Sequence, residues 1–156
     1  MTWIEPGALA ASSLPFMPED IRSLADQGIR AIVSLTEHPI TRFRGVEEAL
    51  AAQAIAYLNS PIDDHHPPSC AQADQILAWI DEQNAAGRPV LVHCNAGVGR
   101  TGTVLHAYFI GRGHSFAAAN AAVRRVRSQS TLLSERQRAF LHQYVEHIAA
   151  RAAGTE

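Results

Sequence analysis

The stretch "VLVHCNAGVGRTGT", residues 90–103, gathers residue types that can do chemistry. His93 and Cys94 stand just before a glycine-rich turn that ends in Arg100 and Thr101. Glycines in such a turn let backbone N–H groups point inward and form a nest for an anion. An arginine adds a guanidinium fork that matches two phosphate oxygens. The stretch therefore predicts a cradle for a tetrahedral oxyanion, of which phosphate is the common one.

Cys94 stands at the lip of this predicted cradle. Inward-facing amides and the positive end of the next helix dipole favour a thiolate there. A thiolate beneath a bound phosphate is an in-line nucleophile, and its attack gives a cysteinyl-phosphate. We expect Thr101 to donate its hydroxyl to the sulfur and help it leave, and His93 to brace the loop backbone. The phosphate itself is expected to be held by the loop residues Asn95, Ala96, Gly97, Val98, Gly99 and Arg100.

Two simpler interpretations of this loop exist. A single cysteine at the end of an apolar strand is usually a buried small hydrophobe. A glycine-rich strand-to-helix turn also holds nucleotides, but this one matches neither GxxxxGK[ST] nor GxGxxG. The joint pattern of His-Cys, five residues, Arg and Thr favours the catalytic interpretation.

The rest of the chain predicts alternating strands and helices around this loop. The expected strands are a pair within 3–12 around a Pro-Gly turn, then 29–37, 55–62 and 88–94. The expected helices are 18–28, 45–54, 71–87, 101 to about 110, 116 to about 127 and 135 to about 150. A polar loop that contains two prolines separates the expected strand 55–62 from the expected helix 71–87.

This order predicts an α/β fold with a central, mostly parallel sheet flanked by helices. The strand at 88–94 is apolar on both faces, so it is expected at the centre of the sheet. The glycine-rich loop then follows the carboxyl end of a central strand, where open α/β sheets bind their ligands. With 156 residues, the chain has room for one ordinary domain, expected over 1–156.

Composition narrows the classes of partner. Apolar residues make up 47% and charged residues 18%, and the net charge is -2, so no basic field for nucleic acid or an anionic membrane is expected. No apolar run approaches the length of a membrane span, and the N-terminus lacks the basic start of a signal peptide. Two cysteines do not make a disulfide framework. We expect a cytoplasmic monomer with neither a nucleic-acid nor a membrane partner.

The segment "HCNAGVGRTG" matches the His-Cys-x5-Arg-Ser/Thr signature of the cysteine-dependent protein tyrosine phosphatase superfamily. The segments "WIEPGALAASSLP", "LADQGIRAIVSLTE", "DDHHPP" and "ADQILAWIDEQNAAGRPVLVHC" resemble the corresponding parts of small atypical dual-specificity phosphatases. The resemblance implies a phosphatase-like fold and hydrolysis of phosphotyrosine, and also of phosphoserine or phosphothreonine, in a phosphorylated protein or peptide. This chemistry requires neither a metal nor another cofactor.

The family takes its general acid from an aspartate on a mobile loop upstream of the nucleophile, commonly as Asp-x-x-Pro. The loop "SPIDDHHPPS" offers Asp63 and Asp64, and Asp64 fits that pattern. Asp63 is the alternative acid, and aspartates beside proline also serve simply as turn residues. The histidines at 65 and 66 and the two aspartates invite a metal site, but four adjacent loop residues cannot all face one ion. We expect the histidines to flank the pocket mouth instead.

Two features in the last third of the chain remain open. Gln137 resembles a glutamine that helps to place water in the family, but the match is loose, and an exposed helix residue is the favoured interpretation. Arg124, Arg125 and Arg127 form a basic cluster that we expect to face solvent, with docking of an acidic or phosphorylated partner as the alternative.

The substrate class also has alternatives. Inositol phosphates, phosphoinositides or RNA 5′-phosphates are possible substrates, and a phosphate-binding module without turnover is a further option. Inositide-directed relatives often carry lysines in the loop to meet extra phosphates. Asn95, Ala96 and Val98 are neutral and small, which favours the protein phosphatase.

Overall fold

The computed structural model describes residues 1–154 of the 156-residue chain. Within them a single sheet holds five short strands. In chain order these strands are β1 (Thr2–Glu5), β2 (Leu9–Ser12), β3 (Ala31–Ser34), β4 (Ala56–Asn59) and β5 (Val90–His93). They lie side by side in the order β1-β2-β5-β3-β4, with β5 at the centre.

The sheet is parallel except at one edge. β2 and β3 each run parallel to β5, and β4 runs parallel to β3. Only β1 is antiparallel to its neighbour β2, because the tight turn that starts at Pro6 reverses the chain. The fold confirms the expected α/β class with a central, mostly parallel sheet.

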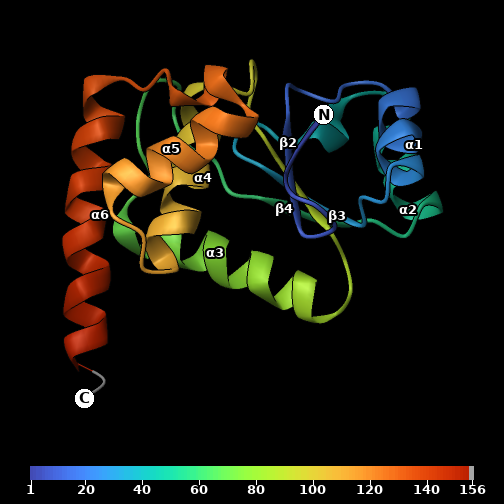
Figure 1. Cartoon of the computed structure of the whole chain (residues 1–156). Helices are drawn as coiled ribbons and strands as arrows, with labels where there is room; N and C mark the ends of the chain where they lie inside the picture. The colour runs from blue at the N-terminus through green and yellow to red at the C-terminus, as the bar shows by residue number, and fades with distance from the viewer. Residues whose placement is uncertain (155–156) are drawn as a thin grey trace.

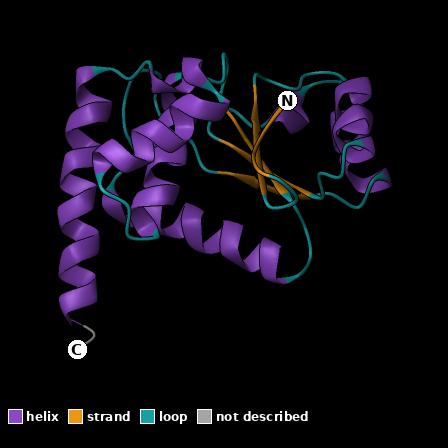
Figure 2. Cartoon of the chain, viewed as in Figure 1, coloured by secondary structure: helices purple, strands orange, loops and turns teal. Residues whose placement is uncertain are grey.

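The described residues also form six α-helices and two short 3-10 helices. The α-helices are α1 (Pro18–Asp26), α2 (Val46–Ala52), α3 (Cys70–Ala85), α4 (Gly99–Gly111), α5 (Phe116–Val126) and α6 (Glu135–Gly154). The 3-10 helices are η1 (Ile40–Arg42) and η2 (Ser128–Thr131). Figure 1 shows α1 and α2 on one side of the strands and α3 to α6 on the other, and Figure 2 shows the strands between the two groups of helices.

Successive side chains of the central strands pack into two separate hydrophobic cores, one on each face of the sheet. Val90 and Val92 of β5 pack with α3, α4, α5 and α6, whereas Leu91 between them packs with α1 and α2. β3 alternates in the same way, with Val33 on the larger core and Ile32 on the smaller one. A strand that is buried on both faces has apolar residues at successive positions, which explains the apolar run of the predicted strand 88–94.

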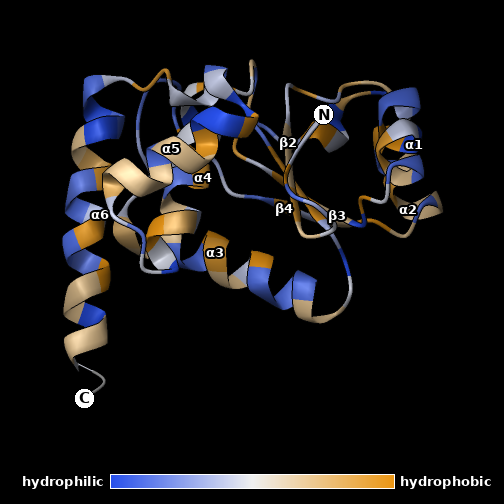
Figure 3. Ribbon diagram, in the orientation of Figure 1, coloured by the Kyte–Doolittle hydropathy of each residue, from blue (hydrophilic) through white to orange (hydrophobic). Residues whose placement is uncertain are grey.

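Local signals set where several helices begin. The Ser69 hydroxyl accepts the backbone N–H of Gln72 at 3.1 Å and caps α3. Ser115 caps α5 in the same way through Ala118 N–H, also at 3.1 Å. Figure 3 shows hydrophilic and hydrophobic residues alternating along α3 and α6, as expected for helices with one face on the core and one in solvent. No helix within residues 1–154 is long and apolar enough to cross a membrane.

The carboxyl ends of the parallel strands meet at one edge of the sheet. His93, the last residue of β5, is in register with both Ser12 of β2 and Ser34 of β3. The chain that leaves β5 therefore lies between the chains that leave β2 and β3. This arrangement gathers the candidate residues at the edge that the sequence predicted.

Candidate active site

Residues 94–100 connect β5 to α4, and this segment is called the phosphate loop after the sequence prediction. Gly97 has φ +73°, and a Cβ at this position would lie 2.6 Å from the Ser12 carbonyl oxygen, so only glycine fits. The loop backbone is also tied to the β2–α1 connection, because Leu14 N–H donates to the Asn95 carbonyl at 2.9 Å. Gly99 differs from the expectation that it serves backbone conformation. It opens α4 without a positive φ, and its missing side chain makes room for the Gln137 amide.

Cys94 lies at the start of this loop and is 3% exposed. The Thr101 hydroxyl donates a hydrogen bond to Cys94 Sγ at 3.1 Å, the contact that the sequence predicted. A hydroxyl in this position stabilises a thiolate, because its O–H points at the sulfur. The contact joins a thiol at the start of the loop to a hydrogen-bond donor in the first turn of α4.

His93 is fully buried and belongs to a chain of hydrogen bonds behind the loop. Its Nδ1 donates to the Cys94 carbonyl at 2.8 Å, and its Nε2 accepts from the Ser34 hydroxyl. Ser34 in turn accepts from the Tyr57 hydroxyl at 2.8 Å, and Tyr57 accepts Ile40 N–H at 3.0 Å. Burial lowers the pKa of His93 to about 4, outweighing the opposing effect of the Cys94 carbonyl. The neutral imidazole thus fixes the direction of the Cys94 carbonyl.

Arg100 is 4% exposed, and its hydrogen bonds are made by the NH1 end of the guanidinium. Its NH1 group forms an ion pair with Glu37 and donates to the Ile62 carbonyl at 3.0 Å. Among residues 1–154, Arg100 Nε is the one buried side-chain nitrogen or oxygen without a hydrogen-bond partner. The edge formed by Nε and NH2, which suits two oxygens of one oxyanion, is therefore not taken up by Glu37.

Glu37 is a site residue that the sequence interpretation missed. It follows β3, at the same carboxyl edge of the sheet as the phosphate loop. The available signal was an acidic residue at the end of the apolar segment 29–37.

Asp64 and Asp63 differ in their surroundings, although they are neighbours in the acid loop, residues 60–69. Asp64 Oδ1 lies 3.6 Å from Arg100 Nε, and Asp64 lines the same cavity as Cys94. Asp63 is not among the residues that line this cavity, and its carbonyl accepts His66 N–H at 3.0 Å in a turn. Of the two candidate acids, Asp64 is the one placed toward the phosphate loop.

His65 and His66 have separate contacts. His65 lines the cavity mouth, with Nε2 3.6 Å from Asp64 Oδ2. His66 Nδ1 donates to the Asp64 carbonyl at 2.9 Å, and its Nε2 accepts from the Arg136 guanidinium. Within the described part of the chain, no group of three or more His, Cys, Asp or Glu side chains is arranged to hold a metal ion.

Gln137 corrects one expectation, since it is not a helix-surface residue. It is 1% exposed, in the first turn of α6, and lines the cavity next to Gly99. Its Oε1 accepts Ser134 N–H at 2.9 Å, and its Nε2 donates to the His66 carbonyl at 3.4 Å. The sequence around Gln137 is typical of an exposed helix. The residue is buried because the segments that contain His66 and Ser134 pack over the start of α6.

Arg127 corrects a second expectation, that the three clustered arginines all face solvent. Arg124 and Arg125 are exposed, but Arg127 is 7% exposed. Its guanidinium donates to the Gly97 carbonyl at 3.3 Å and to Ser130 Oγ at 3.1 Å. Burial lowers the pKa of Arg127, whereas the nearby Cys94 charge raises it. Arg127 thus binds the backbone of the phosphate loop at Gly97 and places a second buried positive charge, besides Arg100, next to this loop.

These residues enclose a cavity of about 400 Å³ at the carboxyl edge of the sheet. The residues that line it are Asp64, His65, Cys94, Asn95, Ala96, Val98, Gly99, Arg100, Leu132, Leu133, Ser134 and Gln137. The cavity brings together a thiol, a guanidinium whose Nε has no hydrogen-bond partner, and a carboxylate. Groups of these three types can act as a nucleophile, an oxyanion clamp and a proton donor.

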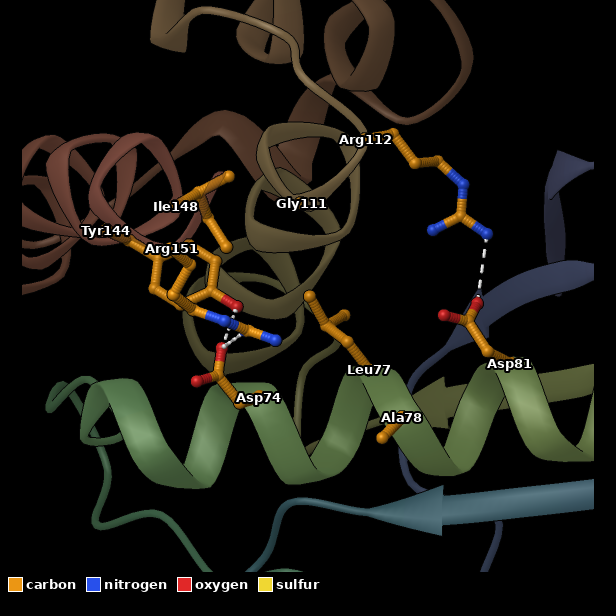
Figure 4. A pocket seen from close by; sticks show the side chains of 9 residues that line it. All are labelled: Asp74, Leu77, Ala78, Asp81, Gly111, Arg112, Tyr144, Ile148 and Arg151. Atoms are coloured by element: carbon orange, nitrogen blue, oxygen red, sulfur yellow. Dashed lines mark hydrogen bonds and ion pairs between the residues drawn. The ribbon is translucent and has the colours of Figure 1, made fainter. Parts of the chain in front are cut away.

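A second cavity, of about 180 Å³, lies between α3, the end of α4 and α6 (Figure 4). Its charged side chains already pair with one another. Asp74 accepts from the Tyr144 hydroxyl at 2.7 Å and from Arg151 at 3.0 Å, and Arg112 pairs with Asp81 at 3.1 Å. Because each guanidinium has a carboxylate partner, this cavity presents a balanced set of charges and holds α3 against its neighbours.

Comparison with known proteins shows the family to which the chain belongs. Residues 1–153 match the family described as Swiss Army Knife protein, DSP-PTPase phosphatase domain. The phosphatidylglycerophosphatase and protein-tyrosine phosphatase 1 of Rattus norvegicus is 27% identical over 145 residues, which cover 90% of this chain and 74% of the rat protein.

The chain is also similar to solved structures over nearly its whole length. A mutant form of Tk-PTP is 32% identical, with a TM-score of 0.83 and 95% of each chain covered. The structure of PTPMT1 is 25% identical, with a TM-score of 0.84 and 98% of each chain covered.

Proposed function

The chain belongs to the cysteine-dependent protein tyrosine phosphatase superfamily, as a small atypical dual-specificity phosphatase, and we propose that it hydrolyses phosphotyrosine in proteins through a cysteinyl-phosphate. In this proposal Cys94 is the nucleophile, Arg100 clamps the phosphoryl oxygens and Asp64 is the general acid. The activity is assigned to one catalytic domain over 1–156, of which residues 155 and 156 lie outside the described part.

One observation carries the proposal. Arg100 Nε is buried without a hydrogen-bond partner, in the cavity that also contains Cys94 and Asp64. A buried, charged N–H group without a hydrogen bond is costly, and an oxyanion that accepts from it removes that cost. Phosphate on the Nε and NH2 edge of Arg100 would lie within the phosphate loop, whose start carries the thiol.

The first chemical step transfers the phosphoryl group to sulfur. The Cys94 thiolate attacks phosphorus, an S–P bond forms, and the P–O bond to the tyrosine oxygen breaks in line with it. The electron pair of that bond goes to the leaving oxygen, which takes a proton from the Asp64 carboxyl group. Arg100 and the loop amides hold the three remaining oxygens, where negative charge accumulates.

The second step hydrolyses the cysteinyl-phosphate. Water attacks phosphorus and gives its proton to the ionised Asp64, while the S–P bond breaks and its electron pair returns to sulfur. The Thr101 hydroxyl, 3.1 Å from Cys94 Sγ, stabilises the departing thiolate. The buried amide of Gln137 borders the cavity, and we propose that it orients the attacking water.

A second candidate substrate class comes from one relative. The rat protein at 27% identity is named for both phosphatidylglycerophosphatase and protein-tyrosine phosphatase activity. A lipid phosphate is therefore the alternative substrate for this chain. Against it stand Asn95, Ala96 and Val98, the neutral loop positions that line the cavity and add no cation for further phosphates.

A turnover screen tests the proposal. The purified chain is assayed with peptides that carry phosphotyrosine, phosphoserine or phosphothreonine, and with phosphatidylglycerophosphate, inositol phosphates and an RNA 5′-phosphate. We expect the largest kcat/KM for phosphotyrosine peptides and almost complete loss of turnover in Cys94→Ser. That variant should still bind tungstate, because the loop and Arg100 are intact. Substantial activity in Cys94→Ser, or a clear preference for a lipid phosphate, would overturn the proposal.

A further inference from the structure

Leu132 is a large apolar side chain that the fold leaves in the open. At 68% exposed, it is the most exposed large hydrophobic residue within residues 1–154. It also lines the cavity that contains Cys94 and Arg100. An exposed leucine by itself is unremarkable, but one at the edge of a reactive cavity is positioned to contact whatever the cavity binds.

The segment that carries Leu132, residues 128–134, is fixed to the phosphate loop and to the acid loop. Ser130, within η2, donates from its hydroxyl to the Gly97 carbonyl at 2.9 Å. Ser134 donates from its hydroxyl to the His65 carbonyl at 2.8 Å. Both ends of the segment are therefore anchored to the groups that hold the phosphate and the acid. The backbone at Leu132 is therefore fixed before a ligand binds. When a ligand covers Leu132, only the rotamer freedom of its side chain is lost.

The lining of the cavity is partly charged and partly apolar. Asp64 and Arg100 line it beside Cys94, with Asp64 Oδ1 3.6 Å from Arg100 Nε. The side chains of Ala96, Val98, Leu132 and Leu133 line it as apolar groups. His65, Asn95, Ser134 and Gln137 also line the cavity and can hydrogen-bond. A substrate with hydroxyls or further phosphates would lose hydrogen bonds only where these substrate groups meet the four apolar side chains. A substrate with a flat hydrocarbon ring in that place would bury apolar surface on both sides.

We propose that Leu132 is a specificity-determining residue that packs against the aromatic ring of an aryl phosphate, so that the cavity selects phosphotyrosine over alkyl phosphates. The inference rests on the proposed function, which supplies phosphotyrosine as the substrate. It adds Leu132 as the residue that contacts the aromatic ring. Leu132 does not touch the reacting atoms in this assignment. It acts on binding of the ring, and the phosphate loop acts on the phosphoryl group.

The experiment measures binding with two probes that have non-hydrolysable C–P bonds. Phenylphosphonate and methylphosphonate are titrated into the full chain, and the leucine methyl groups are followed by NMR. Phenylphosphonate should bind more tightly and should shift the Leu132 methyl resonances through the ring current, whereas methylphosphonate should leave them almost unchanged. Covering about half of a leucine side chain corresponds to roughly 5-fold in affinity, which Leu132→Ala should lose for phenylphosphonate alone. Val126→Ala, at an apolar residue that is 39% exposed and does not line the cavity, is the matched control.

Kinetics give a second measurement. Leu132→Ala and Leu132→Lys should raise KM for a phosphotyrosine peptide with little change in kcat, because the ring contact holds equally before and in the transition state. The inference is overturned if the wild-type chain does not prefer phenylphosphonate, if the Leu132 resonances do not move, or if Leu132→Ala keeps the preference. Failure of the proposed function would give a different result. Phenylphosphonate would still bind more tightly than methylphosphonate in a way that depends on Leu132, but the chain would not hydrolyse phosphotyrosine.

Discussion

Glu37 and Arg100 lie 63 positions apart in the sequence and form an ion pair at the carboxyl edge of the sheet. The pair uses the NH1 end of the guanidinium, which the Ile62 carbonyl also binds, at 3.0 Å. Two acceptors on one nitrogen fix the plane of the guanidinium before any substrate arrives. In the proposed mechanism, the opposite edge of the guanidinium is therefore already oriented when the phosphoryl group arrives.

Glu37→Ala should therefore weaken phosphate binding although Arg100 itself is unchanged. We expect about 10-fold weaker binding of vanadate and a similar loss of kcat/KM, because the clamp loses one of its two orienting contacts. Glu37→Gln keeps an acceptor oxygen and should recover much of the affinity. Inhibition by vanadate at fixed ionic strength measures both variants. Equal losses in the two variants would show that the charge of Glu37, rather than its hydrogen bond, holds the arginine.

Asp64→Asn should affect poor leaving groups most. Loss of a general acid typically costs about 10²–10⁴-fold, and the loss should be far larger for a phosphotyrosine peptide than for an activated nitrophenyl ester. The alkaline limb of the pH profile should flatten as well, since it reports the acid that has been removed. Asp63→Asn is the control on the adjacent residue. If Asp63→Asn shows this pattern and Asp64→Asn does not, the acid is assigned one position too late.

Gln137→Ala should slow the second step rather than the first. A lost hydrogen bond to the attacking water corresponds to about 10-fold in rate. Cysteinyl-phosphate should accumulate, and rapid mixing should show a burst of product before the slower steady state. Gln143→Ala, at an exposed glutamine of the same helix, is the control. A slower burst in Gln137→Ala would place the glutamine in the first step instead.

His93 should stay neutral well below neutral pH, because burial lowers its pKa from 6.5 to about 4. Between these two values the unfolded chain binds a proton that the folded chain does not, so the free energy of unfolding falls as the pH is lowered through this window. The full effect is on the order of 3 kcal/mol. NMR of the imidazole nitrogens checks the protonation state, and urea denaturation at pH 7 and pH 4.5 checks the stability. A midpoint near 6.5 for His93 would contradict the prediction.

Asp74→Ala should destabilise the fold without changing catalysis. Asp74 accepts from Tyr144, which is fully buried, and from His147 at 2.8 Å, so the variant leaves a buried hydroxyl without its partner. The expected cost is about 1–3 kcal/mol in the free energy of unfolding, with kcat/KM unchanged. Asp81→Ala, which removes an exposed pair with Arg112, should cost well under about 1 kcal/mol. Similar costs in both variants would mean that the Tyr144 contact contributes little.

The sequence predicted the parts of the fold that depend on neighbouring residues. The double-faced apolar run at Val90 indicated a central strand, and β5 lies at the centre of the sheet. The spacing from Cys94 to Arg100 predicted one loop, and both side chains line one cavity. These predictions succeed because strand periodicity and loop geometry are local properties of the chain.

Three features depended on contacts between distant segments and were not predicted correctly. Glu37 was missed because nothing in its own neighbourhood indicates an arginine 63 positions away. Gln137 and Arg127 have ordinary helical surroundings in the sequence, yet each is buried by a turn that packs across it. Local propensity cannot report burial of this kind, because the covering groups come from elsewhere in the fold.

The burial of α4 has a consequence for how the protein can lose its function. Every residue from 100 to 110 is buried, and the helix packs against β5, α3, α5 and α6. Its amides can exchange with solvent only when those elements separate, so we expect hydrogen exchange in α4 at the rate of global opening. The half of the phosphate loop that joins α4 cannot fray independently of the core. In rising denaturant, phosphate binding should therefore disappear in the same transition as the tertiary structure, with no folded but inactive form between them.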